Sequence, residues 1–250
     1  MSESKKVGLA LGGGAALGAS HIGVLRYLEE NNYEVTHLAG TSVGALVGGA
    51  YVSGASIGEL IRFARRARWT SLTRPSIPRL SLFTNERLRD QVRRLVDDKQ
   101  FDETSVPFVA IACSLISGQE IVMREGSLVN AILASCAIPG IFEPFETGGD
   151  LLCDGGIVNQ VPDDVVWDMG ATKVIAVDLI SRVTGNERPN NLFGVFYKSL
   201  NILMKRTMSY RPETVVIYPD TTGFLTTDLK NYRTLISIGY RAAQATLEKL

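Results

Sequence analysis

A serine flanked by glycines is the first candidate for chemistry in this 250-residue chain. The run Gly40-Thr41-Ser42-Val43-Gly44 matches the pattern G-x-S-x-G, in which a sharp strand-to-helix turn exposes a nucleophilic serine oxygen. The apolar run 35–39 before it and the small residues 45–51 after it predict that strand and that helix. The start of the helix would direct backbone N–H groups at a reacting carbonyl, which favours attack by Ser42. A glycine-rich turn without chemistry is the alternative.

The proton acceptor for such a serine must come from a residue other than histidine. Both histidines, His21 and His37, precede Ser42, whereas triads on α/β-hydrolase sheets place the histidine last in the chain. We interpret His37 as a structural residue of a strand and His21 as packing or loop support. Asp154 is the best candidate, because it follows an apolar pair and precedes Gly155-Gly156, where two backbone segments can approach closely. A dry site can raise the pKa of an aspartate from about 3.9 toward neutrality, although an ordinary Asp-Gly turn is the alternative.

A third motif, Gly12-Gly13-Gly14, stands between an apolar run and a helical pattern. Backbone N–H groups at such a helix start can stabilise an oxyanion, so this loop is the candidate oxyanion hole. Dinucleotide or phosphate binding is the rival interpretation. It is weak here, because the spacing to Gly18 does not form G-x-G-x-x-G and the acidic Glu34 lies before the second strand instead of at its end.

Apolar runs and helical patterns alternate along the chain, which favours a three-layer α/β fold with a mainly parallel sheet and helices on both faces. We expect one domain over residues 1–250, with an irregular loop at Trp69–Phe83 and a polar loop at Gly185–Asn191. The expected strands are 7–11, 35–39, 108–113, 173–179 and 215–218, and the expected helices are 17–28, 45–51, 86–96, 128–136, 161–169 and 192–208.

Composition is that of an ordinary soluble globular protein. Hydrophobic residues make up 45% of the chain and the formal net charge is zero, which argues against nucleic-acid binding. We see neither a secretory segment nor a membrane span, and no residue cluster that requires a metal or cofactor. The odd, scattered cysteines suggest reduced thiols and a cytoplasmic location; they are Cys113, Cys136 and Cys153.

Two segments suggest peripheral membrane contact. Residues 62–94 contain ten arginines against two acidic residues, and the helical pattern 192–208 combines an apolar stripe with nearby cations. Both patterns have common alternatives, a solvated charged face for the first and a core-packing helix for the second. The sequence leaves the oligomeric state open.

Taken in order, the motifs resemble the patatin-like phospholipase family. The resemblance rests on the glycine loop followed by His21–Leu25, on Gly40–Gly44, and on Asp154-Gly155-Gly156, with similar supporting stretches at Ala134–Pro144 and Val158–Pro162. It extends over about Val7 to Leu179. The glycines that support the motifs are Gly12, Gly18, Gly40, Gly44, Gly155 and Gly156.

The resemblance implies an acyl-hydrolase that cleaves lipid esters without a cofactor, with Ser42 as nucleophile and Asp154 as base. It also implies an oxyanion hole at Gly13, Gly14 and Ala15. The sequence departs from the family at two positions, because Ala15 stands where glycine is usual and Leu17 where many members have Arg or Lys. Loss of one oxyanion donor can cost about 10²–10³ in rate, so a non-catalytic or weakly active lipid-binding protein is an alternative. An acyltransferase is another.

Overall fold

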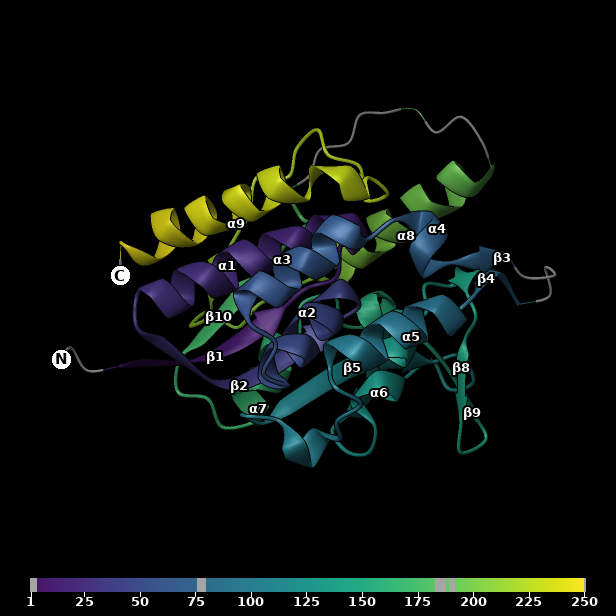
Figure 1. The fold of residues 1–250 in the computed structure, drawn as a ribbon, viewed down its shortest axis with the longest axis horizontal. Coiled ribbons are helices and arrows are strands. Elements are labelled where there is room, and N and C mark those ends of the chain that lie inside the picture. The colour runs from purple at the N-terminus through teal and green to yellow at the C-terminus, as the bar shows by residue number, and fades with distance from the viewer. Residues whose placement is uncertain (1–3, 76–79, 183–187, 189–191, 250) are drawn as a thin grey trace.

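A mostly parallel sheet organises the chain, as the computed structural model shows for residues 4–75, 80–182, 188 and 192–249 (Figure 1). Five neighbouring strands run parallel, and the remaining strands pair antiparallel at one side. The strands in spatial order are β11 (Val215–Ile217), β10 (Val174–Val177), β1 (Lys5–Leu11), β2 (Tyr33–Thr41), β5 (Phe108–Ser114), β9 (Asp150–Asp154) and β8 (Phe145–Thr147), with β6 (Glu120–Met123) also paired to β5.

Helices cover both faces of this sheet, which confirms the expected α/β architecture. Side chains alternate along β1, so that Leu9 and Leu11 enter the larger core and Ala10 the smaller one on the opposite face. The smaller core lies against α7 (Asp163–Asp168). The larger core is built with α1 (Ala19–Glu30), α2 (Val43–Val52), α3 (Ile57–Arg66), α5 (Glu86–Leu95), α6 (Leu128–Ser135) and α9 (Tyr232–Leu247).

The close packing of α1 on α9 was not anticipated from the sequence. Figure 1 shows the two helices running side by side along the top of the molecule. A Cβ atom on Gly23 would lie 1.9 Å from the carbonyl oxygen of Ile236, and one on Gly239 would lie 1.9 Å from that of Ser20. These glycines allow the two backbones to touch, which fastens the C-terminal helix to the first βα unit.

The segment Trp69–Phe83 is more ordered than expected, so the prediction of an irregular loop is wrong for much of it. It contains α4 (Trp69–Leu72), β3 (Arg74–Pro75) and the start of β4 (Ser81–Thr84). The reason is a long-range partner, because β4 pairs in parallel with β7 (Gly140–Phe142). Residues 76–79 and most of the predicted polar loop 185–191 lie outside the described residues.

The helix α8 (Leu192–Thr207) agrees with the predicted helix 192–208. In Figure 1 it lies at the same end of the molecule as α4, β3 and β4. No helix among the described residues is both long and apolar enough to span a bilayer.

Candidate active site

Ser42 occupies a tight turn between β2 and α2. Its backbone has φ 55° and ψ −124°, a conformation that costs a non-glycine residue free energy and marks a constrained position. The turn passes close to its neighbours, since a Cβ on Gly44 would lie 2.0 Å from the carbonyl oxygen of Leu11. The backbone N–H of Ser42 donates to Ser135 Oγ at 2.8 Å, so α6 holds the turn from the other side. The serine side chain is thereby presented in a fixed direction.

The strand β5 brings Asp154 to Ser42. Thr41 is the register partner of Ile111, and Asp154 is the partner of the next residue, Ala112. Because β6 pairs with these same β5 residues, β2 and β9 must share the opposite edge of β5 and meet end to end. The Ser42 hydroxyl lies close enough to the carboxyl group of Asp154 to lower its pKa, and both side chains line the same small chamber. Two residues separated by more than a hundred positions are therefore brought together.

Burial changes the acid–base character of Asp154. Its exposed fraction is 3%, and burial raises the pKa of its carboxyl group to about 6. Hydrogen bonds from the Ser42 hydroxyl and from the Gly156 N–H, the latter at 2.9 Å, lower this pKa but do not outweigh burial. A carboxylate with this pKa is ionised at neutral pH and can still accept a proton there.

The glycine loop lies beside Ser42 and Asp154, and its residues Gly13, Gly14 and Ala15 line the same small chamber. The Gly13 N–H already donates to the carbonyl of Gln160 at 3.1 Å. Within the described part of the chain, the N–H groups of Gly14 and Ala15 make no hydrogen bond. Ala15 has φ 48°, a left-handed conformation that explains why glycine is usual at this position.

Leu17 and His21 support this loop from beneath. Leu17 is fully buried in the larger core, so an apolar side chain stands where a cation is common in the family. His21 Nε2 lies 2.7 Å from the carbonyl oxygen of Gly12 and donates to it, because a carbonyl only accepts. Burial lowers the pKa of His21 to about 4, which keeps the imidazole neutral. His37 lies in β2, beside the Thr36 hydroxyl at 3.1 Å.

The segment after Asp154 ties the three motifs together. The carbonyl of Asn159 accepts the Thr41 hydroxyl at 2.8 Å, and the carbonyl of Gln160 accepts the Gly13 N–H. The nucleophile turn and the glycine loop are thus both fastened to the chain that carries Asp154. In the sequence this segment is only a supporting stretch of the family resemblance, and no sequence pattern points to a role for Ser135, Asn159 or Gln160.

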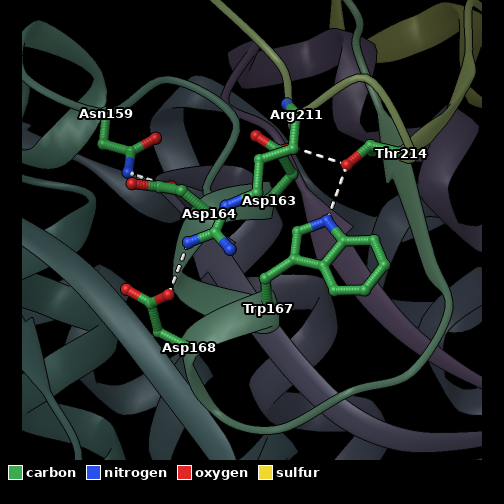
Figure 2. A network of polar contacts seen from close by, with 7 residues as sticks. All are labelled: Asn159, Asp163, Asp164, Trp167, Asp168, Arg211 and Thr214. Carbon is green, nitrogen blue, oxygen red and sulfur yellow. Dashed lines mark hydrogen bonds and ion pairs between the residues drawn. The ribbon is translucent and has the colours of Figure 1, made fainter.

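Figure 2 shows how this segment is anchored in turn. Asp163 at the start of α7 accepts the Thr214 hydroxyl at 2.7 Å and the Arg211 N–H at 3.0 Å. The Trp167 indole N–H donates to Thr214 Oγ1 at 2.8 Å, and Arg211 forms an ion pair with Asp168. The network binds α7 to the chain that leads into β11. Residues 159 and 160 therefore lie between two anchored elements, β9 with Asp154 on one side and α7 on the other.

Two spaces of different character meet at Ser42. One is a cavity of about 130 Å³ with almost entirely apolar walls, which include Phe63, Trp69, Leu72 and Tyr232. The other is a chamber of about 30 Å³, lined by the glycine loop and by Asp154 and Gln160, with α8 as one wall. Ser42 and Ala15 line both spaces. An acyl chain fits the first space by its chemistry, and small polar groups fit the second.

Nothing in the described residues suggests a metal centre, since no three side chains of His, Cys, Asp or Glu gather there. Cys113, Cys136 and Cys153 are free and buried, and burial raises the pKa of each thiol, that of Cys153 to about 12. They are therefore held as thiols and make poor nucleophiles.

The fold and this serine turn define a class, that of α/β proteins with a candidate nucleophile at the carboxyl end of a parallel sheet. The chain belongs to the patatin-like phospholipase family, whose model matches residues 9–167, a range that includes Ser42 and Asp154.

Relatives of this chain match it over only part of their own length. An NTE-family protein of Mycobacterium tuberculosis is 36% identical over 190 residues, which is 75% of this chain and 52% of that protein. The human patatin-like phospholipase domain-containing protein 6 is 35% identical over 184 residues, or 70% of this chain and 13% of that protein. Lysophospholipase NTE1 of Mycosarcoma maydis is 32% identical over 179 residues, 69% of this chain and 10% of that protein. The chain thus spans about half of the mycobacterial relative and a small part of the others.

Two solved structures have a similar fold. VipD from Legionella pneumophila gives a TM-score of 0.67 at 12% identity, covering 99% of this chain and 67% of that one. The type III effector ExoU gives 0.54 at 13% identity, covering 99% and 54%.

Proposed function

We propose that the protein hydrolyses carboxylic esters of lipids through a Ser42–Asp154 dyad and an acyl-enzyme. One observation carries the proposal, the placement of a serine in a constrained turn beside a buried carboxyl group in one chamber, where burial raises the pKa of that carboxyl group to about 6. Membership of the patatin-like phospholipase family supports the same chemistry. The name of the relative in Mycosarcoma maydis, a lysophospholipase, supports a lipid ester as the substrate.

In the first half of the reaction, Asp154 accepts the hydroxyl proton while Ser42 Oγ attacks the ester carbonyl carbon. Gly14 and Ala15 line the shared chamber, and in this mechanism their N–H groups donate to the resulting oxyanion, while the positive end of α2 adds to this stabilisation. Asp154 then returns the proton to the leaving alcohol, and the acyl group stays on Ser42. Water reverses the sequence and releases the acid.

The apolar cavity favours an ester with a hydrocarbon acyl chain over a small polar ester. Its walls include residues of α1, α2, α3, α4, α5 and α9, and Ser42 also lines it. Each buried methylene contributes about 0.8 kcal/mol, so a chain of several carbons adds binding free energy that a short acyl group lacks.

The test compares Ser42→Ala and Asp154→Asn with the wild type on a short aryl ester and with a fluorophosphonate probe. We expect wild-type labelling that is absent in Ser42→Ala, and a loss of turnover of at least about 10³ in both variants. Circular dichroism checks that the variants fold. Undiminished turnover in either folded variant refutes the dyad, and a wild type that neither turns over nor labels supports the lipid-binding alternative.

We also propose peripheral contact with an anionic membrane at the end of the molecule where Ser42 lies. On α8 the side chains of Phe196, Ile202 and Leu203 have exposed fractions of 45%, 50% and 62%, and Leu200 of the same helix lines the chamber. A Cβ on Gly140 would lie 3.8 Å from Phe196, and Gly140 pairs with Ser81, between the exposed Leu80 and Leu82. Apolar side chains therefore surround the covered site.

The arginine-rich stretch contributes only in part to this surface. Arg62, Arg74 and Arg93 pair with nearby acids, whereas Arg65 and Arg66 are exposed at the end of α3 and form no ion pair with any described residue. This end of α3 leads directly to Ala67 and Trp69, which line the acyl cavity. The remaining positive charge lies next to the cavity and suits anionic headgroups.

Co-sedimentation with phosphatidylglycerol-containing vesicles at low salt tests the membrane contact. Arg65→Gln with Arg66→Gln should weaken binding about 30-fold, on the basis of about 1 kcal/mol per charge. The matched control is Arg241→Gln on α9 with Lys249→Gln just after that helix, which removes the same charge and should leave binding unchanged. Equal losses in both pairs would show a nonspecific charge effect and overturn the assigned surface.

A further inference from the structure

Gln160 is a buried polar side chain that the dyad mechanism does not use. Its exposed fraction is 3%, and its side-chain Oε1 is buried without a hydrogen-bond partner among the described residues. The side chain lies between two glycines of the site, since a Cβ on Gly13 would be 2.8 Å from Nε2 and one on Gly156 would be 2.4 Å from Oε1. A buried amide without a partner is rare in folded proteins and calls for a missing partner in the space beside it.

The space beside it is the 30 Å³ chamber that Gln160 lines together with Ser42 and Asp154. A space needs about 10–15 Å³ on this measure to hold one water molecule, which also needs two to four polar partners. The carboxamide of Gln160 and the carboxylate of Asp154, which both line this chamber, provide two such partners.

We propose that this chamber is the binding site of the water that deacylates the enzyme, and that the Gln160 carboxamide holds that water beside Asp154. This inference rests on the proposed function, because it requires an acyl group on Ser42. The backbone of Gln160 is fixed independently by its carbonyl, which accepts the Gly13 N–H. Its side chain is therefore a catalytic contact to the reacting water, separate from the support that its backbone gives to the loop.

Deacylation needs only water, Asp154 and the acylated Ser42. The water oxygen forms a bond to the acyl carbon while its proton passes to the Asp154 carboxylate. The tetrahedral intermediate then breaks the bond between the acyl carbon and Ser42 Oγ, and Asp154 returns the proton to Oγ. The products are a carboxylic acid and the free serine. Because the Gln160 carboxamide holds a water molecule beside Asp154, water is the favoured acceptor, and hydrolysis is favoured over acyl transfer.

The experiment separates acylation from deacylation in Gln160→Leu, Gln160→Asn and the wild type. With an aryl ester we expect kcat to fall at least about tenfold in Gln160→Leu, with KM falling in parallel and kcat/KM unchanged, because only the step after acylation is slowed. Intact-protein mass spectrometry should show the acyl-enzyme accumulating. Fluorophosphonate labelling, which needs no water, should keep its wild-type rate, and Gln160→Asn should recover part of kcat.

A merely structural role predicts a different pattern. It would lower the melting temperature and slow labelling and kcat/KM together, without accumulation of acyl-enzyme, and that result overturns the proposal. Gln160→Ala provides a second test, because it enlarges the chamber; methanol should then compete as acyl acceptor in Gln160→Ala and not in the wild type. Methyl-ester formation by the wild type at the same rate would equally overturn it. Wild-type labelling at Ser42 shows that the dyad stands even if Gln160 fails these tests.

Discussion

Asp154→Asn should inactivate the protein and at the same time stabilise its fold at neutral pH. Burial raises the pKa of Asp154 from 3.8 to about 6, so the folded state is penalised whenever this carboxyl group is ionised. Each pKa unit corresponds to 1.36 kcal/mol, and a difference of about two units gives about 3 kcal/mol. Asparagine keeps an oxygen that can accept the Gly156 N–H and carries no charge, so the variant escapes this penalty.

The sign and the pH window follow from linkage. Between about pH 4 and 6 the folded wild type binds more protons at this site than the unfolded chain does, so its stability from this group falls as pH rises. The gain of Asp154→Asn over the wild type should therefore be near zero at pH 4 and approach about 3 kcal/mol above pH 7. His21 titrates in the same range, but its contribution is common to both proteins and cancels in the difference.

Urea unfolding of both proteins at pH 4.5 and 7.5 measures this difference. The control is Asp102→Asn, at an exposed residue of a short 3-10 helix at Phe101–Glu103, which should change stability by no more than about 0.5 kcal/mol at either pH. A variant that is equally or less stable than the wild type at pH 7.5 would refute the inference that Asp154 is ionised at a free-energy cost. In that case the inactivity of Asp154→Asn would say nothing about the pKa of Asp154.

Three further outcomes are expected. Because Asp154 must be ionised to accept a proton, kcat/KM should fall about tenfold per pH unit below about pH 6 and level off above it, as a pH–rate profile would show. Ala15→Gly should relieve a left-handed backbone at a cost in chain entropy, for a net gain of up to about 1 kcal/mol in urea unfolding with activity retained; a loss of stability would contradict the strain at φ 48°. Ala64→Phe should occupy part of the apolar cavity and lower the preference for laurate over butyrate esters about tenfold, the equivalent of about two methylenes, in paired kcat/KM measurements; an unchanged ratio would remove the cavity from the acyl path.

Much of the fold could be predicted from local sequence patterns. The apolar runs that became β1, β2, β5, β10 and β11 lie in a sheet with both faces covered, which makes them continuous and easy to recognise. The short antiparallel strands β6, β8 and β9 were not anticipated, and neither was β4. They have few residues, and their pairing depends on partners far away in the chain, so neither length nor periodicity marks them.

The candidate site likewise combines features that the local sequence predicts with features that depend on the tertiary structure. The sequence by itself determined the residue types and the local turns. Glycines are required around Ser42 and after Asp154 because the adjoining backbone leaves no room for a Cβ atom there. Only the tertiary structure could pair Thr41 and Asp154 with consecutive residues of β5, bury the carboxyl group enough to raise its pKa, and place Gln160 in the wall of the small chamber beside them. Register, burial and enclosed volume are properties of segments that meet in space, and a linear pattern of residue types does not contain them.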